Sequence, residues 1–204
     1  MKWSWRIGRI GGVDIYIHTT FPLLLAWVGI SSWIDEKSIS ATLAGVLFIL
    51  AIFGCVLLHE LGHALAARRF GIVTRDITLL PIGGVARLER MPDKPLQELW
   101  VAIAGPLVNV VIAVVLFIGL KITAQWTPIG EMIETGGSFV QQLLFVNVAL
   151  VVFNLIPAFP MDGGRVLRAI LALIMDYSIA TQIAATRPRI TCATGKCAGP
   201  PLRR

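Results

Sequence analysis

The chain has 204 residues, of which 56% are hydrophobic and only 15% are charged, and its mean hydropathy is +0.77. Soluble domains carry roughly a quarter charged residues, so this composition excludes an ordinary soluble domain and indicates a membrane protein with several spans. The net charge of +6 is typical of basic cytoplasmic loops, and no aromatic and basic pattern accompanies it that would indicate nucleic-acid binding.

Five apolar stretches follow one another along the chain after a surface segment at 1–18, which is not a cleavable signal peptide and holds an extended piece, VDIYIH. Each stretch is close to the roughly 20 residues that cross a hydrocarbon core. Their approximate ranges are 16–33, 41–67, 99–122, 139–156 and 166–185.

The segment at 72–90, between the second and third stretches, is rich in β-branched residues and contains Gly83 and Gly84. It predicts one or two strands with a bend. The predicted fold class is therefore an all-α polytopic membrane protein with about five to six transmembrane helices and a small β segment between the second and third.

Basic residues predict the orientation of these spans. With a cytoplasmic N-terminus, only Lys37 and Lys121 of the basic residues before the tail face outward. This asymmetry follows the positive-inside rule. The basic residues that then face the cytoplasm are Lys2, Arg6, Arg9, Arg68, Arg69, Arg75, Arg87, Arg90, Lys94, Arg165 and Arg168.

The C-terminal segment departs from this pattern, because after five spans it should lie outside and yet it is basic. Its composition also changes abruptly at TRPRITCATGKCAGPPLRR. We therefore predict a membrane domain at 1–185 and an atypical, disordered tail at 186–204. Either a sixth helix is missing or the fifth stretch does not cross.

The second stretch ends in LLHELGHALAARRF, which contains the pattern H-E-x-x-H at His59, Glu60 and His63. On a helix, residues four apart share a face, so both imidazoles can bind one zinc ion. Glu60 can take a proton from a water on that ion and return it to a leaving amine. Ionisable groups inside a membrane span indicate a functional site by default.

A catalytic zinc usually has three protein ligands, so a third is needed. One candidate is His18, for which an interfacial histidine is the simpler interpretation. The better candidate is Asp162 in NLIPAFPMDGGR, where two prolines and two glycines interrupt the chain directly after an apolar stretch. With Arg68 at the cytoplasmic interface, His63 and His59 lie roughly 7 and 14 Å below the membrane surface.

HELGH, AGPLVN at 104–109 and NLIPAFPMDGGR, in this order, resemble the site-2 proteases, the intramembrane zinc metalloproteases of bacterial and archaeal type. The resemblance covers roughly 10–180. It implies one Zn²⁺ per chain bound by His59, His63 and Asp162, with Glu60 as catalytic acid and base. It also implies that Asn154 contacts the substrate or the developing oxyanion, and that relatives continue with a sixth helix.

The predicted function is hydrolysis of peptide bonds in membrane-anchored substrates, as in regulated intramembrane proteolysis. The strand at Gly83 and Gly84 is expected to pair with the unwound substrate. We expect a multi-pass protein of a prokaryotic cell membrane, with its active site near the cytoplasmic face. Its expected partners are transmembrane protein substrates, the lipid bilayer and a second copy of the chain. A membrane zinc carrier and an inactive homologue that binds substrate are the alternatives.

Overall fold

The computed structural model describes residues 3–175, with gaps at 82, 91–93, 129, 131, 133–136 and 159. The predicted tail at 186–204, the domain boundary at 185 and the end of the fifth apolar stretch lie outside the described residues.

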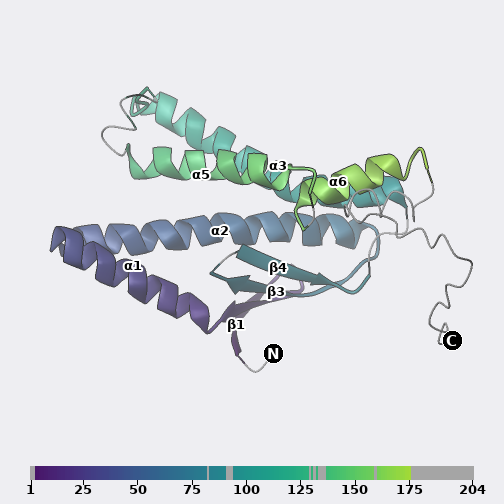
Figure 1. The fold of residues 1–204 in the computed structure, drawn as a ribbon, viewed down its shortest axis with the longest axis horizontal. Helices are drawn as coiled ribbons and strands as arrows, with labels where there is room; N and C mark the ends of the chain where they lie inside the picture. Colours follow the sequence, from purple (N-terminus) through teal and green to yellow (C-terminus); the bar gives the residue numbers. More distant parts are fainter. Residues whose placement is uncertain are drawn as a thin grey trace, which may run out of the picture.

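Within these residues the chain forms two packed groups of helices, with one long helix at the centre. This helix, α2, packs against α1 on one side and α3 on the other, and both α5 and α6 pack against α3 (Figure 1). The helices are α1 (Thr20–Glu36), α2 (Ile39–Arg69), α3 (Pro95–Ile122), α5 (Phe139–Asn154) and α6 (Asp162–Leu171).

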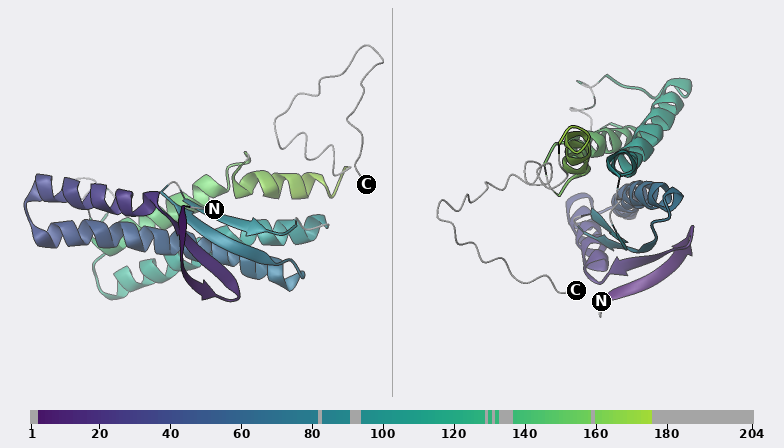
Figure 2. Two further views of the ribbon diagram at one scale, coloured as in Figure 1. Left: turned by 90° about the horizontal axis from the view of Figure 1, so that it is seen from below. Right: turned by 90° about the vertical axis from the view of Figure 1, so that its right-hand side faces the viewer.

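A four-stranded mixed sheet lies against α2, on the opposite side from the layer of α3, α5 and α6 (Figures 1 and 2). The strand order is β1-β2-β3-β4; β2 and β3 are parallel, and the two outer pairings are antiparallel. The strands are β1 (Ser4–Ile10), β2 (Val13–His18), β3 (Thr74–Leu80) and β4 (Gly83–Leu88).

The inner face of the sheet is held to α2 by a small apolar core. Val13 of β2 and Ile77 of β3 pack there against Leu61 and Ala64 of α2, and all four side chains are buried. This contact matters for the site, because the same stretch of α2 carries the H-E-x-x-H pattern. The sheet therefore supports the helix at the position of its polar residues.

The predicted all-α fold class is wrong. A four-stranded sheet stands beside the helices. The extended piece expected at VDIYIH is β2, so the first apolar stretch, 16–33, begins in this strand and continues in α1. The strand β1 was not expected. The expected strands at 72–90 are present as β3 and β4.

The prediction of five to six transmembrane helices is also not supported. Among the described residues, α2 and α3 are the two helices that are long and apolar enough to cross a membrane. By comparison, α1 has 17 residues, α5 has 16 and α6 has 10. Proline at 157 and 160 follows α5 and limits its length, because proline disfavours helix at the preceding residue.

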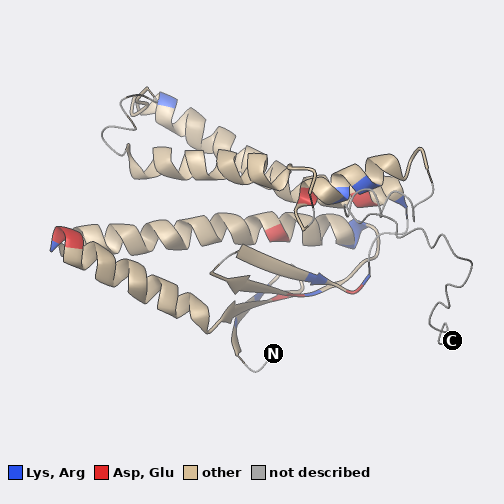
Figure 3. Cartoon of the chain, viewed as in Figure 1, with Lys and Arg blue, Asp and Glu red and all other residues tan. Residues whose placement is uncertain are grey.

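The helices carry their charges toward their two ends, and the stretches between are largely uncharged (Figure 3). Large apolar side chains on the outer surfaces of α2 and α3, such as Leu43, Leu47 and Val115, are exposed. A contiguous apolar surface of this kind suits contact with lipid chains rather than water.

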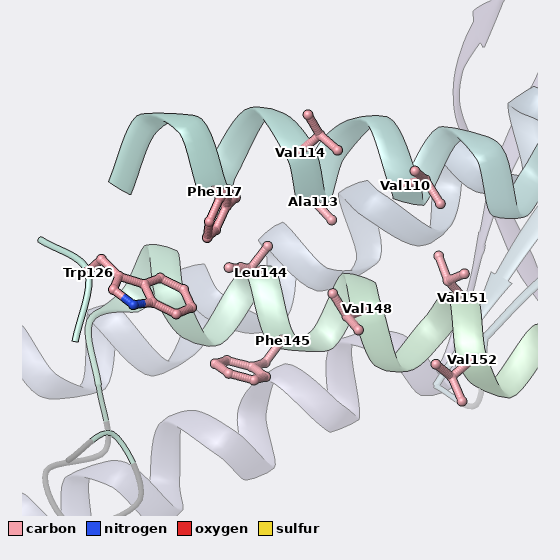
Figure 4. A pocket seen from close by; sticks show the side chains of 10 residues that line it. All are labelled: Val110, Ala113, Val114, Phe117, Trp126, Leu144, Phe145, Val148, Val151 and Val152. Atoms are coloured by element: carbon pink, nitrogen blue, oxygen red, sulfur yellow. The ribbon is translucent and has the colours of Figure 1, made fainter. Parts of the chain in front are cut away.

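A hollow of about 430 Å³ lies between α3 and α5, and apolar and aromatic side chains make up its lining (Figure 4). The rings of Phe117 and Trp126 meet there edge to face, with their centroids 5.3 Å apart. Because its lining contains no metal ligand and no acid or base, this hollow is not the place for metal-dependent or proton-transfer chemistry.

Candidate metal centre and active site

Three buried side chains from two helices meet at one point. His59 and His63 lie one turn apart on α2, and Asp162 is the first residue of α6. The Nε2 atoms of the two histidines are 3.1 Å apart, and Asp162 Oδ2 lies 3.1 Å from His59 Nε2 and 3.0 Å from His63 Nε2. In the part of the chain that the structure describes, these three side chains are the group that could hold a metal ion, since their ligand atoms all lie within 4.8 Å of one another.

This triangle of atoms fits a zinc ion. Bonds of about 2.0–2.1 Å in a tetrahedron place ligand atoms about 3.3 Å apart. Imidazole nitrogen and carboxylate oxygen are both ordinary ligands of zinc, and the three side chains offer one such atom each.

Helix α3 orients His63. The Nδ1–H of the His63 imidazole donates to the carbonyl oxygen of Val101, which lies on α3, at 2.7 Å. The lone pair of His63 Nε2 is therefore directed at the other two ligand atoms. Gly105 of α3 lies directly against the His63 imidazole. A Cβ at this position would lie 2.1 Å from His63 Nε2, so a larger residue would displace the ring. The glycine of AGPLVN thus makes room for a predicted ligand.

The loop before α6 returns Asp162 to the two histidines. α5 ends at Asn154, and Gly163 then packs against the carbonyl groups that follow it. A Cβ on Gly163 would lie 2.3 Å from the Ile156 carbonyl oxygen, so glycine alone fits this approach. The D-G-G sequence therefore serves the geometry of the loop as well as supplying the carboxylate.

A buried ion pair between Glu98 and Arg168 attaches α6 to α3. Arg168 Nε donates to Glu98 Oε1 at 2.9 Å, and a second guanidinium nitrogen donates to the same oxygen. This pair was not expected from the sequence, in which Arg168 stands only among the cytoplasmic charges and Glu98 has no predicted role. The available signal was an acidic residue at the edge of the third apolar stretch.

Glu60 faces a cavity of about 330 Å³ beside the three ligands. A Cβ on Gly84 would lie 2.6 Å from Glu60 Cγ, so β4 holds the glutamate at close range. The structure thus brings all the expected site residues to one place, from α2, β4, the end of α5 and α6. The cavity lining includes His59, Glu60, Gly83, Gly84, Asn109, Asn154, Pro160 and Met161.

His18, the other candidate for the third ligand, lies elsewhere. It ends β2, and its Nδ1 is 2.8 Å from the hydroxyl oxygen of Thr20. Of the two candidates, the structure brings only Asp162 to the histidine pair among the described residues.

Two histidines and a carboxylate, with a glutamate on the same helix, define the class of zinc metalloproteases with an H-E-x-x-H helix. Residues 47–194 match the model of a family described as peptidase family M50. The chain is 44% identical over 186 residues to a zinc metalloprotease of Methanocaldococcus jannaschii, and this match covers 91% of this chain and 50% of that protein. It is 32% identical over 120 residues to stage IV sporulation protein FB of Bacillus subtilis, covering 58% of this chain and 38% of that protein.

A solved structure of a site-2 protease from Methanocaldococcus jannaschii is also similar. Its TM-score is 0.62 at 39% sequence identity, and the match covers 89% of this chain and 78% of that chain. The chain belongs to peptidase family M50, the membrane-embedded site-2 protease family, which confirms the predicted family, its zinc metalloprotease class and its zinc cofactor. The chain spans about half the length of the curated relatives that it matches.

Proposed function

We propose that this chain is an intramembrane zinc metalloendopeptidase that cuts membrane-anchored proteins, with residues 1–185 as its proteolytic domain. The observation that carries the proposal is one cavity lined by both Glu60 and His59, whose imidazole meets His63 and Asp162. These residues lie on or against α2, whose other surfaces are strongly apolar. Polar groups at such a position need a function to offset their cost in the membrane.

His59, His63 and Asp162 would hold the zinc ion, which when bound supplies Lewis-acid activation of water and of the substrate carbonyl. Glu60 is adjacent to His59 in sequence and lines the same cavity. Its carboxylate accepts the proton of the attacking water and then gives it to the leaving amine. Gly84 supports this role because its missing side chain leaves room for the Glu60 methylene groups.

The substrate must leave its helical conformation before cleavage, because a helix hides its carbonyl groups in its own hydrogen bonds. β4 is an edge strand of the sheet, and its first residues, Gly83 and Gly84, line the cavity. An unwound segment can add to this edge and present its carbonyl near Glu60. Asn154 lines the same cavity from the end of α5 and would donate to the developing oxyanion.

The basic residues support a site near the cytoplasmic face of a prokaryotic cell membrane. Arg68 and Arg69 end α2 only one to two turns after His63, and Arg68 donates to the Gly11 carbonyl oxygen of the β1–β2 turn. The sheet and the N-terminus would therefore lie on the cytoplasmic side. Transmembrane proteins would be the substrates.

The test is cleavage of a membrane-anchored model substrate by the purified protein and by its Glu60→Gln variant. We expect the wild type to cleave, and the variant to bind as much zinc but to lose cleavage, because glutamine cannot accept the proton. Equal cleavage by both proteins, or no cleavage by the wild type with zinc bound, would overturn the proposal.

A further inference from the structure

Asn109 is a buried polar side chain at the wall of the catalytic cavity. It lies on α3 and is fully buried, and neither its amide nitrogen Nδ2 nor its oxygen Oδ1 has a hydrogen-bond partner among the described residues. The cavity that it lines also contains His59 and Glu60. Buried polar groups are nearly always paired, so a bare amide at a cavity wall indicates a ligand that pairs with it.

The other fully buried amides of the helices are engaged. Gln141 accepts from the Thr127 hydroxyl at 2.7 Å and donates to the Thr127 carbonyl at 2.8 Å. Asn147 on α5 donates to the Leu143 carbonyl oxygen at 2.9 Å and contacts Cys55 Sγ at 3.4 Å. Neither of these residues lines the cavity. Asn147 Oδ1 also has no hydrogen-bond partner among the described residues, so Asn109 differs in that neither of its amide atoms is paired and in that it lines the cavity.

The chemistry of a primary amide points to the type of ligand. Asn109 offers one acceptor and two donor hydrogens, the same combination that a backbone peptide group needs from a partner. An unwound segment inside a membrane exposes N–H and C=O groups that must be paired within protein. Asn154 presents a second amide to the same cavity from α5, and Glu60, which packs against Gly84 of β4, also lines it.

We propose that the Asn109 amide binds a backbone peptide group of the unwound substrate, adjacent to the bond that is cut. The inference rests on the proposed proteolytic function. Asn109 would be a substrate-binding residue on α3, opposite the β4 edge that pairs with the other side of the substrate segment. It would lower the cost of bringing a bare backbone to the metal centre, and water would occupy its place before substrate binds.

One alternative role is open to the same atoms. His59 Nδ1 is also buried without a hydrogen-bond partner among the described residues, and a turn of the Asn109 side chain could supply it with an acceptor. Asn109 would then position a metal ligand, as the Val101 carbonyl does for His63. The two roles predict different effects of removing the Asn109 amide. If it positions His59, zinc binding weakens by about 10- to 100-fold; if it binds substrate, zinc binding is unchanged and substrate binding weakens.

The first test compares Asn109→Leu with Asn147→Leu, since leucine has the same number and branching of side-chain heavy atoms as asparagine and both sites are fully buried. Asn109→Leu is expected to lower kcat/KM for a membrane substrate by about tenfold or more, through loss of one or two hydrogen bonds. Its zinc affinity and melting temperature should be those of the wild type. Asn147→Leu should lower the melting temperature and leave kcat/KM per folded molecule unchanged.

The second test alters the substrate. Once the cut bond is mapped by mass spectrometry, each neighbouring amide of a synthetic transmembrane peptide is replaced in turn by an ester, which removes one N–H donor. One ester should lower the kcat/KM of the wild type by about tenfold and have a much smaller effect on Asn109→Leu, because the partner is already absent. Equal loss in both proteins at every position would contradict the proposal.

Binding of the uncleaved peptide separates this proposal from the proteolytic function. In a Glu60→Gln background, Asn109→Leu should weaken peptide binding by about tenfold, whether or not the wild type cleaves. Unchanged binding together with unchanged kcat/KM would overturn the role of Asn109. Weakened zinc binding would assign Asn109 to His59 instead, and a melting temperature lowered as in Asn147→Leu would make it a packing residue.

Discussion

Glycines set how closely the helices approach each other at the metal centre. Gly62 of α2 faces α3, and a Cβ there would lie 2.8 Å from the Ala104 carbonyl oxygen. Gly105 of α3 faces back toward His63. Small residues at such contacts let membrane helices pack closely. Here the close approach also places the imidazole against the Val101 carbonyl that orients it.

We predict that Gly105→Ala weakens zinc binding at least tenfold, because the new methyl group displaces His63 Nε2 from the ligand triangle. Gly119→Ala on the same helix is the matched control, since a Cβ there meets no atom within 4 Å. Zinc affinity measured by competition with a chelator distinguishes the two variants. Equal affinities would mean that His63 tolerates a shift and that the glycine has another purpose.

The sequence predicted which side chains converge at the candidate metal centre, but not the residues that support them. His59 and His63 could be recognised because a spacing of four places them on one helical face, and Asp162 because of the broken helix around it. Gly105 and Asn109 act across an interhelical contact, which depends on how α2 and α3 are rotated against each other. The pattern of apolar residues within one helix does not determine how two helices are rotated against each other.

Helix α6 is short, and it is held in place by contacts rather than by its own length. It has 10 residues, and isolated helices of that length are marginal. The buried pair of Arg168 with Glu98 attaches it to α3, and Asp162 lies at its first position. The position of the third ligand therefore depends on an ion pair about two turns away.

Removing one partner of this pair, as in Glu98→Ala, should destabilise the protein by about 3–5 kcal/mol, because the other charge stays buried. It should also lower zinc affinity, since α6 loses its attachment. Glu89→Ala is the control: its partner Arg75 is 73% exposed and Glu89 42%, so the cost should be about 0–1 kcal/mol. Unfolding monitored with and without zinc tests both effects, and similar stabilities of the two variants would contradict this role.

Pairing of the substrate with the edge of β4 has a testable consequence for cleavage rates. In a strand, alternate N–H groups point to the same side, so pairing with β4 would use every second amide of the unwound segment. A series of peptides, each with one N-methylated amide, should therefore show cleavage rates that fall and recover with a period of two. A loss that declines smoothly with distance from the cut bond would argue against strand pairing.

Sequence patterns predicted the strands better than the way in which they pair. β3 and β4 stood out because Gly83 and Gly84 lie among β-branched residues between two apolar stretches, and β2 stood out as the extended piece VDIYIH. β1 was not predicted. The sheet itself depends on parallel pairing of β2 with β3, and α1 and α2 separate these strands in the chain. Local patterns contain no signal for such a distant contact.

At the largest scale, the sheet and most of the described basic residues lie around one end of α2, and the turn between α1 and α2 lies at the other (Figure 3). That turn contains Asp35 and Glu36, and Lys37 closes it with a left-handed backbone. From the positive-inside rule we expect the basic end to face the cytoplasm. A tag at the N-terminus should therefore be cut by added protease in inside-out vesicles but stay intact in right-side-out cells, and the reverse result would invert the orientation.

One zinc ion, held by His59, His63 and Asp162, would make this chain a protease. This can be tested by titrating the metal-free protein in lipid with zinc and following the cleavage of a membrane-anchored substrate. We expect cleavage to rise linearly and to stop rising at one zinc per chain, and Asp162→Ala to need far more zinc. Cleavage without zinc, or an Asp162→Ala curve identical to that of the wild type, would contradict it.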